Sequence, residues 1–273
     1  MDKNQTSITE ISILGFQNLH NFRIPLFTLF LLMYILTIYE NVLIIALVST
    51  SRNLQTPMYF FLQQLSISDL LVTGNVVPIM LLTLINEEAI LSLAGCITQL
   101  YFFGSFETFQ CLLLTIMSTD RYLAICKPLR YTSIMNHRVC VKLTSMSWAS
   151  SFSTVAISIN SIRQLQFCKQ NSIDHFFCDL NPLLQLSCSD PSIIKSSAGR
   201  QKAFSTCSSH LAVVSIFFGA LISIYVIPPR KQSGALTKVL SLLYTVLVPL
   251  INPMIYSLRN TDIKKAFKNM LAN

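Results

Sequence analysis

The chain has 273 residues, of which 52% are hydrophobic and only 12% are charged. A soluble protein carries roughly 25% charged residues, so neither a soluble globular surface nor a disordered chain fits this composition. The net charge of +8 suits either nucleic acid or an anionic membrane surface. The placement of the apolar residues decides between these two partners.

Six long apolar blocks follow one another along the chain, and each exceeds the ~20 residues that a helix needs to cross a bilayer. Because a helix satisfies its own backbone groups in lipid, each block predicts a membrane-spanning helix. The expected helices cover about 24–49, 57–85, 94–122, 139–162, 203–227 and 236–258. We therefore expect an all-α polytopic membrane protein with one domain over 1–273 and no nucleic-acid partner.

The fourth block is the least apolar of the six. Half of the residues in Leu143–Ile162 are Ser, Thr or Asn. Small hydroxyl residues let helices approach closely, so this block can form an interior span, although it would insert only marginally by itself. An alternative with five spans, in which this block stays out of the bilayer, therefore remains open.

Cysteines and a glycosylation motif point to one face of the membrane. Asn4 opens an N-glycosylation acceptor in the segment 1–23. Cys96 begins the third block, and Cys168, Cys178 and Cys188 lie in the loop after the fourth. Four cysteines at one face fit disulfides in an oxidising compartment. Zinc is the competing interpretation, but the three loop cysteines are ten residues apart without a short Cys-x-x-Cys pair. We expect an extracellular N-terminus and no metal site.

Four strings, taken together, resemble the olfactory receptors, a branch of the rhodopsin-like G protein-coupled receptors. They span nearly the whole chain in the family's order. The strings are Pro57–Leu62, Met117–Cys126, Lys202–Leu211 and Asn252–Asn260.

The resemblance implies an activation switch at the cytoplasmic side, formed by Asp120, Arg121, Tyr122, Asn252, Pro253 and Tyr256. A charge such as Arg121 at the membrane boundary must pair or meet water, so its pairing can differ between two states. The alternative is a simple interfacial Arg that extends toward water. Pro253 interrupts the hydrogen bonds of the last helix, and the resemblance implies that Tyr256 can then swing toward Arg121.

The resemblance also implies an intramembrane polar core of Asn41, Asp69 and Gln110. Gln110 stands where the family commonly has Glu, which puts a sodium-type site beside Asp69 in doubt. The same resemblance implies two disulfides, Cys96–Cys178 and Cys168–Cys188.

By resemblance, the ligand binds among the outer halves of the third, sixth and seventh helices. The implied ligand-binding residues are Phe103, Gly104, Glu107, Thr108, Phe218 and Tyr244. Glu107 is an intramembrane carboxylate, which is a functional hypothesis by default, and it would favour a hydrogen-bonding or cationic ligand. The alternative is that Glu107 is protonated or bonded to a neighbouring helix.

The largest departure from the family pattern is a missing apolar span. Residues 163–202 hold the cysteine-rich loop and a junction at which the family's fifth helix is absent. With six spans and an outside N-terminus, 9 basic residues lie inside and 11 outside, against the positive-inside rule. One added span would give 13 inside and 7 outside, and the five-span alternative gives 15 and 5. Five spans would separate Cys96 from Cys178.

The sequence therefore predicts a plasma-membrane odorant receptor that binds a small, mostly apolar ligand and activates a stimulatory, olfactory-type heterotrimeric G protein. The tail 259–273 contains a short basic amphipathic helix suited to anionic membrane lipid. We expect no cofactor and no enzymatic activity, because no phosphate loop, metal cluster or nucleophile–base set is present. The alternative is a truncated, signalling-defective homologue, retained in the endoplasmic reticulum or associated with intact receptors. A transporter or channel would require inverted repeats, which the sequence lacks.

Overall fold

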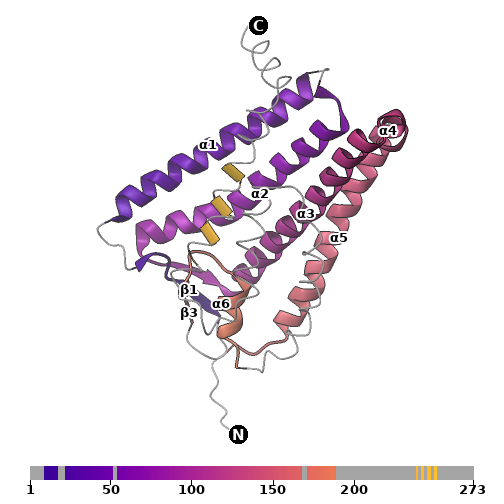
Figure 1. Ribbon diagram of the computed structural model, residues 1–273. Coiled ribbons are helices and arrows are strands. Elements are labelled where there is room, and N and C mark those ends of the chain that lie inside the picture. The colour runs from indigo at the N-terminus through magenta and orange to yellow at the C-terminus, as the bar shows by residue number, and fades with distance from the viewer. Residues whose placement is uncertain are drawn as a thin grey trace.

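A computed structural model describes residues 9–17, 22–51, 54–167 and 171–188, together with 238, 241–242, 245–246 and 249–250. Four long helices dominate this part of the chain and lie side by side, each against the next (Figure 1). Their bounds are α1 (Arg23–Thr50), α2 (Pro57–Asn86), α3 (Leu93–Cys126) and α5 (His137–Arg163). They occupy the first four apolar blocks. The block 203–227 lies outside the described residues, as does most of 236–258.

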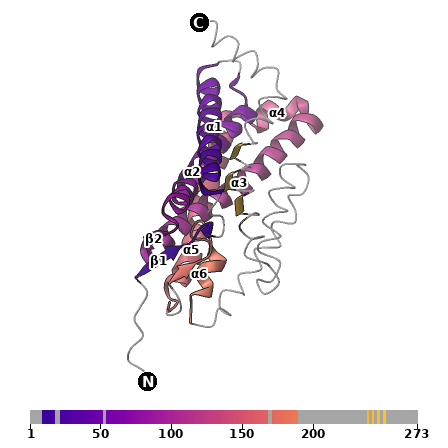
Figure 2. The same cartoon turned by 90° about the vertical axis from the view of Figure 1, so that its left-hand side faces the viewer.

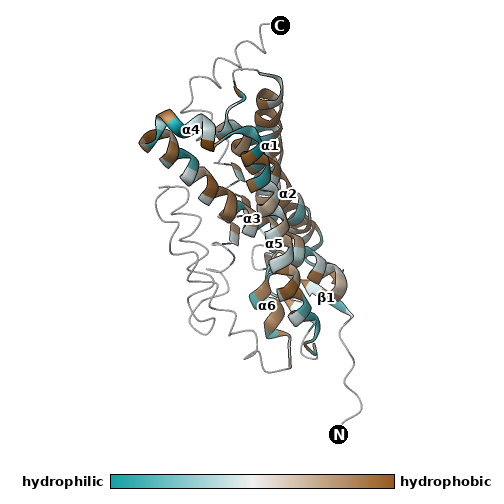
Figure 3. Ribbon diagram, turned by 90° about the vertical axis from the view of Figure 1, so that its right-hand side faces the viewer, coloured by the Kyte–Doolittle hydropathy of each residue, from teal (hydrophilic) through white to brown (hydrophobic). Residues whose placement is uncertain are grey.

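Helices α1, α2 and α3 are the described helices that are long and apolar enough to cross a membrane. Hydrophobic residues predominate along them, as Figure 3 shows. The first turns of α2 and α3 contain residues that commonly begin a helix. Pro57 occupies the first turn of α2, where a missing N–H costs nothing. The side chain of Ser92 accepts a hydrogen bond from the Gly95 N–H at the start of α3.

The Ser-rich fourth block forms a continuous helix, α5, of 27 residues. Six serine hydroxyls donate to carbonyl oxygens about one turn earlier, so these six do not remain unpaired in an apolar environment. The buried Thr144 hydroxyl is an exception, because it has no hydrogen-bond partner among the described residues. Ser147 donates to Leu143 O at 2.9 Å and Ser153 donates to Ala149 O at 2.7 Å. This pairing explains how a block that is half hydroxyl and amide residues can form a helix as long as its apolar neighbours.

A small sheet lies at one end of the helices (Figure 2). Strand β1 (Glu10–Ile13) pairs antiparallel with β2 (Ala89–Ser92) and parallel with β3 (Ser172–Ile173), in the order β2-β1-β3. The N-terminal segment, the α2–α3 connection and the loop after α5 therefore meet at the same end. This sheet is not among the elements expected from the sequence.

Two short helices complete the described part of the fold. Helix α6 (Leu180–Gln185) lies beside the sheet, and α4 (Pro128–Ile134) lies at the opposite end of the bundle (Figure 1). The loop that precedes α6 contributes Phe176 and Phe177 to the main hydrophobic core, where they join Phe103 and Phe106 of α3. The loop is thus packed against the outer half of α3.

Candidate ligand-binding site and activation switch

The outer half of α3 carries four of the residues that the sequence analysis assigned to ligand binding. Phe103 and Glu107 are buried, whereas Gly104 and Thr108 are half-buried. The Thr108 hydroxyl donates to the Gly104 carbonyl at 2.7 Å, so its hydrogen bond is made within the helix. Phe103 and Glu107 lie one turn apart on the same face.

A disulfide holds the loop after α5 against this part of α3. Cys96 and Cys178 are bonded, and the Cys178 N–H donates to the Gln99 side-chain oxygen at 3.0 Å. The rings of Phe103 and Phe177 meet edge to face, with centroids 5.0 Å apart. Because the bridge requires both cysteines in one compartment, it is incompatible with the five-span alternative.

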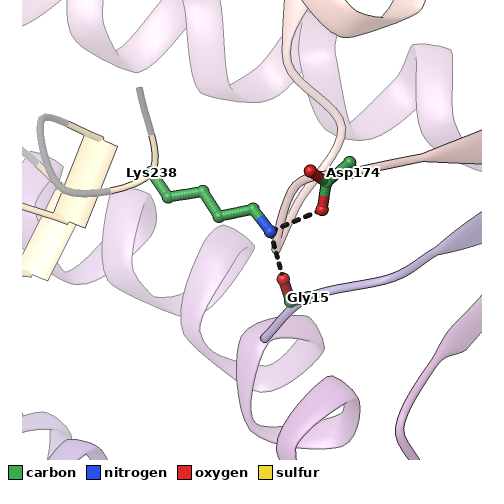
Figure 4. Close-up of polar contacts among 3 residues, drawn as sticks. All are labelled: Gly15, Asp174 and Lys238. Carbon is green, nitrogen blue, oxygen red and sulfur yellow. Dashed lines mark hydrogen bonds and ion pairs between the residues drawn. The ribbon is translucent and has the colours of Figure 1, made fainter. Parts of the chain in front are cut away.

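Lys238 joins three distant parts of the chain at this end (Figure 4). Its ammonium donates to the Gly15 carbonyl at 2.6 Å and to the Asp174 carboxylate at 2.5 Å. In the same loop, the Nε2 atom of His175 forms a hydrogen bond with the Ser241 hydroxyl, at a distance of 3.2 Å. Burial, reinforced by the Lys238 charge, lowers the pKa of His175 from 6.5 to about 3. The imidazole is therefore neutral at physiological pH.

Two acidic residues of the long helices, Glu40 and Glu107, have a buried oxygen without a hydrogen-bond partner among the described residues. Glu40 is affected at Oε2 alone, whereas Glu107 is only 8% exposed and has no such partner at either carboxylate oxygen. Buried polar groups normally find partners, so this arrangement calls for an explanation.

The intramembrane polar core forms two separate contacts. The Gln110 side-chain amide donates to Asp69 Oδ1 at 2.8 Å. Asn41 donates to the carbonyls of Thr37 at 2.9 Å and Pro249 at 3.2 Å. Gln110 thus supplies Asp69 with a neutral donor.

At the end of α3 opposite the sheet, the Asp120 carboxylate accepts a hydrogen bond from the Tyr131 hydroxyl at 2.8 Å. Arg121 is exposed and its guanidinium contacts the Met58 sulfur. Tyr122 is exposed. Burial and the bond to Asp120 raise the pKa of Tyr131. Sequence reasoning missed Tyr131, although Pro128 is a recognisable first-turn signal for the short helix that carries it.

Several predicted site residues lie outside the described residues. They are Asn4, Cys168, Phe218, Tyr244, Asn252, Pro253 and Tyr256. Cys188 is disulfide-bonded, but Cys168, its predicted partner, is one of these residues.

Comparisons with known proteins define the class to which this arrangement belongs. Residues 40–195 match the 7 transmembrane receptor (rhodopsin family) model, and residues 192–273 match the olfactory receptor model. Human olfactory receptor 11L1 is 41% identical, with 98% of this chain and 94% of the relative covered. Mouse olfactory receptor 5AP2 is also 41% identical, with 100% and 96% covered. The chain therefore belongs to the olfactory receptor family, whose members are multi-pass membrane receptors and not enzymes.

The same comparisons bear on the missing span. The match to olfactory receptor 11L1 extends over 302 residues, although this chain has 273. The relative thus includes at least 29 aligned positions without a counterpart here. The two family matches meet at residues 192–195, which is where the sequence analysis placed the junction. Both observations support a missing internal segment.

Proposed function

We propose that the chain is an odorant receptor of the plasma membrane that binds a small, mostly apolar ligand and activates a stimulatory heterotrimeric G protein. The ligand site comprises Phe103, Gly104, Glu107 and Thr108 of α3 together with Phe218 and Tyr244. The observation that carries the proposal is the loop residue Phe177, which the Cys96–Cys178 bridge fixes beside Phe103. An apolar ligand of the outer half of α3 would meet this aromatic pair.

Signalling would start from the opposite end of the same helix. Asp120 accepts a hydrogen bond from Tyr131, and the adjacent Arg121 is exposed. In the proposed orientation, this end of α3 faces the cytoplasm. Ligand binding would change the balance between two arrangements of this end by its difference in affinity for them. The proposed switch also includes Tyr122, Asn252, Pro253 and Tyr256.

The test is an odorant screen in cells that express the full chain, with cAMP and surface staining as readouts. A cAMP response that Arg121→Ala abolishes at unchanged surface level would support the proposal. The control is Arg130→Ala, which removes an exposed cation from α4 outside the proposed switch. Normal expression without surface staining would favour the retained, signalling-defective homologue. A chain that reaches the cell surface but gives no cAMP response to any odorant would contradict the proposal.

A further inference from the structure

Both carboxylate oxygens of Glu107 are buried and lack a hydrogen-bond partner among the described residues. The neighbouring buried carboxylates do not share this feature. Asp69 accepts a hydrogen bond from Gln110, and Asp120 accepts one from Tyr131. The described residues therefore provide donors for the two carboxylates that flank Glu107 along the bundle, and they provide none for Glu107 itself.

The position of Glu107 on α3 explains why its neighbours on this helix do not supply that donor. One turn outward, Phe103 packs against Phe177. One turn inward, the Gln110 side-chain amide donates its hydrogen bond to Asp69. Glu107 thus lies between an aromatic pair and a second acid.

No cation among the described residues neutralises this carboxylate. Between described residues, the ion pairs are Arg23–Glu87 and Lys238–Asp174, both at the outer end of the bundle. Arg121 is on α3 itself, but it is 14 residues away, about 21 Å along the helix axis. An unpaired carboxylate at such a buried site is strongly disfavoured.

The number of missing donors indicates the chemistry of the missing partner. An ammonium group presents three N–H donors and a positive charge, so it can satisfy both oxygens and compensate the charge. A hydroxyl group has a single O–H donor and would leave one oxygen unpaired. The faces of the nearby aromatic rings also attract cations.

We propose that the ligand of this receptor is a small protonated amine, whose ammonium pairs with Glu107 while its apolar part packs against Phe103 and Phe177. This inference rests on the proposed function, because it assigns a chemical class to the ligand of the same site. Glu107 is accordingly the residue that determines ligand class, and Phe103 is one of the residues that limit ligand shape.

The experiment uses the purified full chain and pairs of probes that differ only in the polar group. The probes are phenethylamine with 2-phenylethanol and cyclohexylamine with cyclohexanol, and binding is measured by ligand-dependent thermal stabilisation at neutral pH. We expect each amine to bind at least about tenfold more tightly than its alcohol, as a charge-assisted hydrogen bond requires. Glu107→Gln should remove this difference, and Glu107→Asp should keep part of it.

Glu40→Gln is the matched control, since it makes the same change to another membrane carboxyl on α1. It should leave the preference for amines unchanged. If Glu107→Gln fails to fold, the comparison of amine with alcohol in the wild-type and Glu107→Asp proteins decides the question.

The remaining outcomes would overturn either the amine assignment alone or the receptor function as well. Equal binding of amines and alcohols, or an amine preference that survives Glu107→Gln, would remove the amine assignment and leave the proposed receptor function intact. Alcohols that bind better than amines would identify Glu107 as a protonated acid and likewise overturn the assignment. A folded chain that binds no probe, and shows no odorant-dependent cAMP response in cells, would contradict both proposals.

Discussion

The two ends of the bundle are stabilised in different ways. At the outer end, the Cys96–Cys178 disulfide, the three-stranded sheet and Lys238 connect the N-terminal segment and two loops to the helices. At the opposite end, which we propose to face the cytoplasm, helix α4 buries none of its residues. It is connected to α3 by the hydrogen bond from Tyr131 to Asp120.

This difference suits a receptor with the proposed function. A ligand site gains affinity when its walls are held in one geometry before binding. An effector surface that must change between two arrangements needs contacts that open at a small cost in free energy. We therefore expect substitutions at the outer end to affect stability most, and those at the cytoplasmic end to affect signalling most.

The largest expected effect comes from the disulfide. The Cys96→Ser/Cys178→Ser variant should lose about 4 kcal/mol of unfolding free energy in the chain-entropy model, because the bridge closes a loop with a sequence separation of 82. Denaturant unfolding of the purified receptor measures the loss. Cys126→Ser, at an exposed thiol outside the bridge, is the control. A double variant as stable as the control would show that the bridge does not hold the outer end.

Gly15 tests the close contact between the N-terminal segment and α2. Its φ is +58°, and an added Cβ would lie only 2.4 Å from the Thr83 hydroxyl oxygen. Gly15→Ala should therefore lower the unfolding free energy by about 1–3 kcal/mol. Gly74→Ala is the matched control in α2, where an added Cβ meets nothing within 4 Å. Equal melting temperatures for the two variants would contradict this contact.

His175 makes the outer end sensitive to acid. Because its pKa is about 3 in the folded protein and 6.5 ordinarily, the unfolded chain binds the proton first as the pH falls. Stability should decrease below pH ~6.5 by up to about 1.4 kcal/mol per pH unit, until the folded pKa is reached. Melting temperatures at pH 7 and pH 5.5 measure the slope. His175→Gln should reduce it, whereas His137→Gln, at an exposed residue of α5, should not.

The sequence predicts the helices better than it predicts the outer end. A membrane helix satisfies its hydrogen bonds within one continuous segment, so an apolar block such as 94–122 is a sufficient signal. The strand Glu10–Ile13 has only four residues. Its partners in β2 lie 76 to 82 positions away in the sequence, and those in β3 lie 160 positions away. Its pairing depends on tertiary contacts that no local pattern specifies.

The same distinction applies to the candidate sites. Resemblance assigned Phe103, Glu107 and Asp120 because each belongs to a helix with a recognisable motif. It did not reveal that Glu107 would lack a partner or that Tyr131 would bind Asp120. Those features depend on which side chains the packing brings together. The alternation of polar and apolar residues in Glu10–Ile13 was a local signal that could have indicated the strand, although not its partners.

The smallest expected effect on stability, and the most informative one for signalling, comes from Tyr131. Tyr131→Phe removes the hydroxyl that donates to Asp120 and keeps the ring. One hydrogen bond contributes about 0.5–1.5 kcal/mol, so the receptor should remain folded and reach the cell surface at a similar level. Freed from Tyr131, Asp120 can interact with the adjacent Arg121, and the balance between the two cytoplasmic arrangements should move by up to about tenfold.

Ligand-independent cAMP, normalised to surface receptor, measures this change in cells. Tyr39→Phe removes a hydroxyl from an exposed tyrosine of α1 and should leave the basal signal unaltered. A Tyr131→Phe receptor with the basal and odorant-dependent signals of the wild type would show that the Asp120–Tyr131 bond is structural only. A changed basal signal with an unchanged melting temperature would show that this single contact, unlike the cross-links at the outer end, acts on the signalling equilibrium.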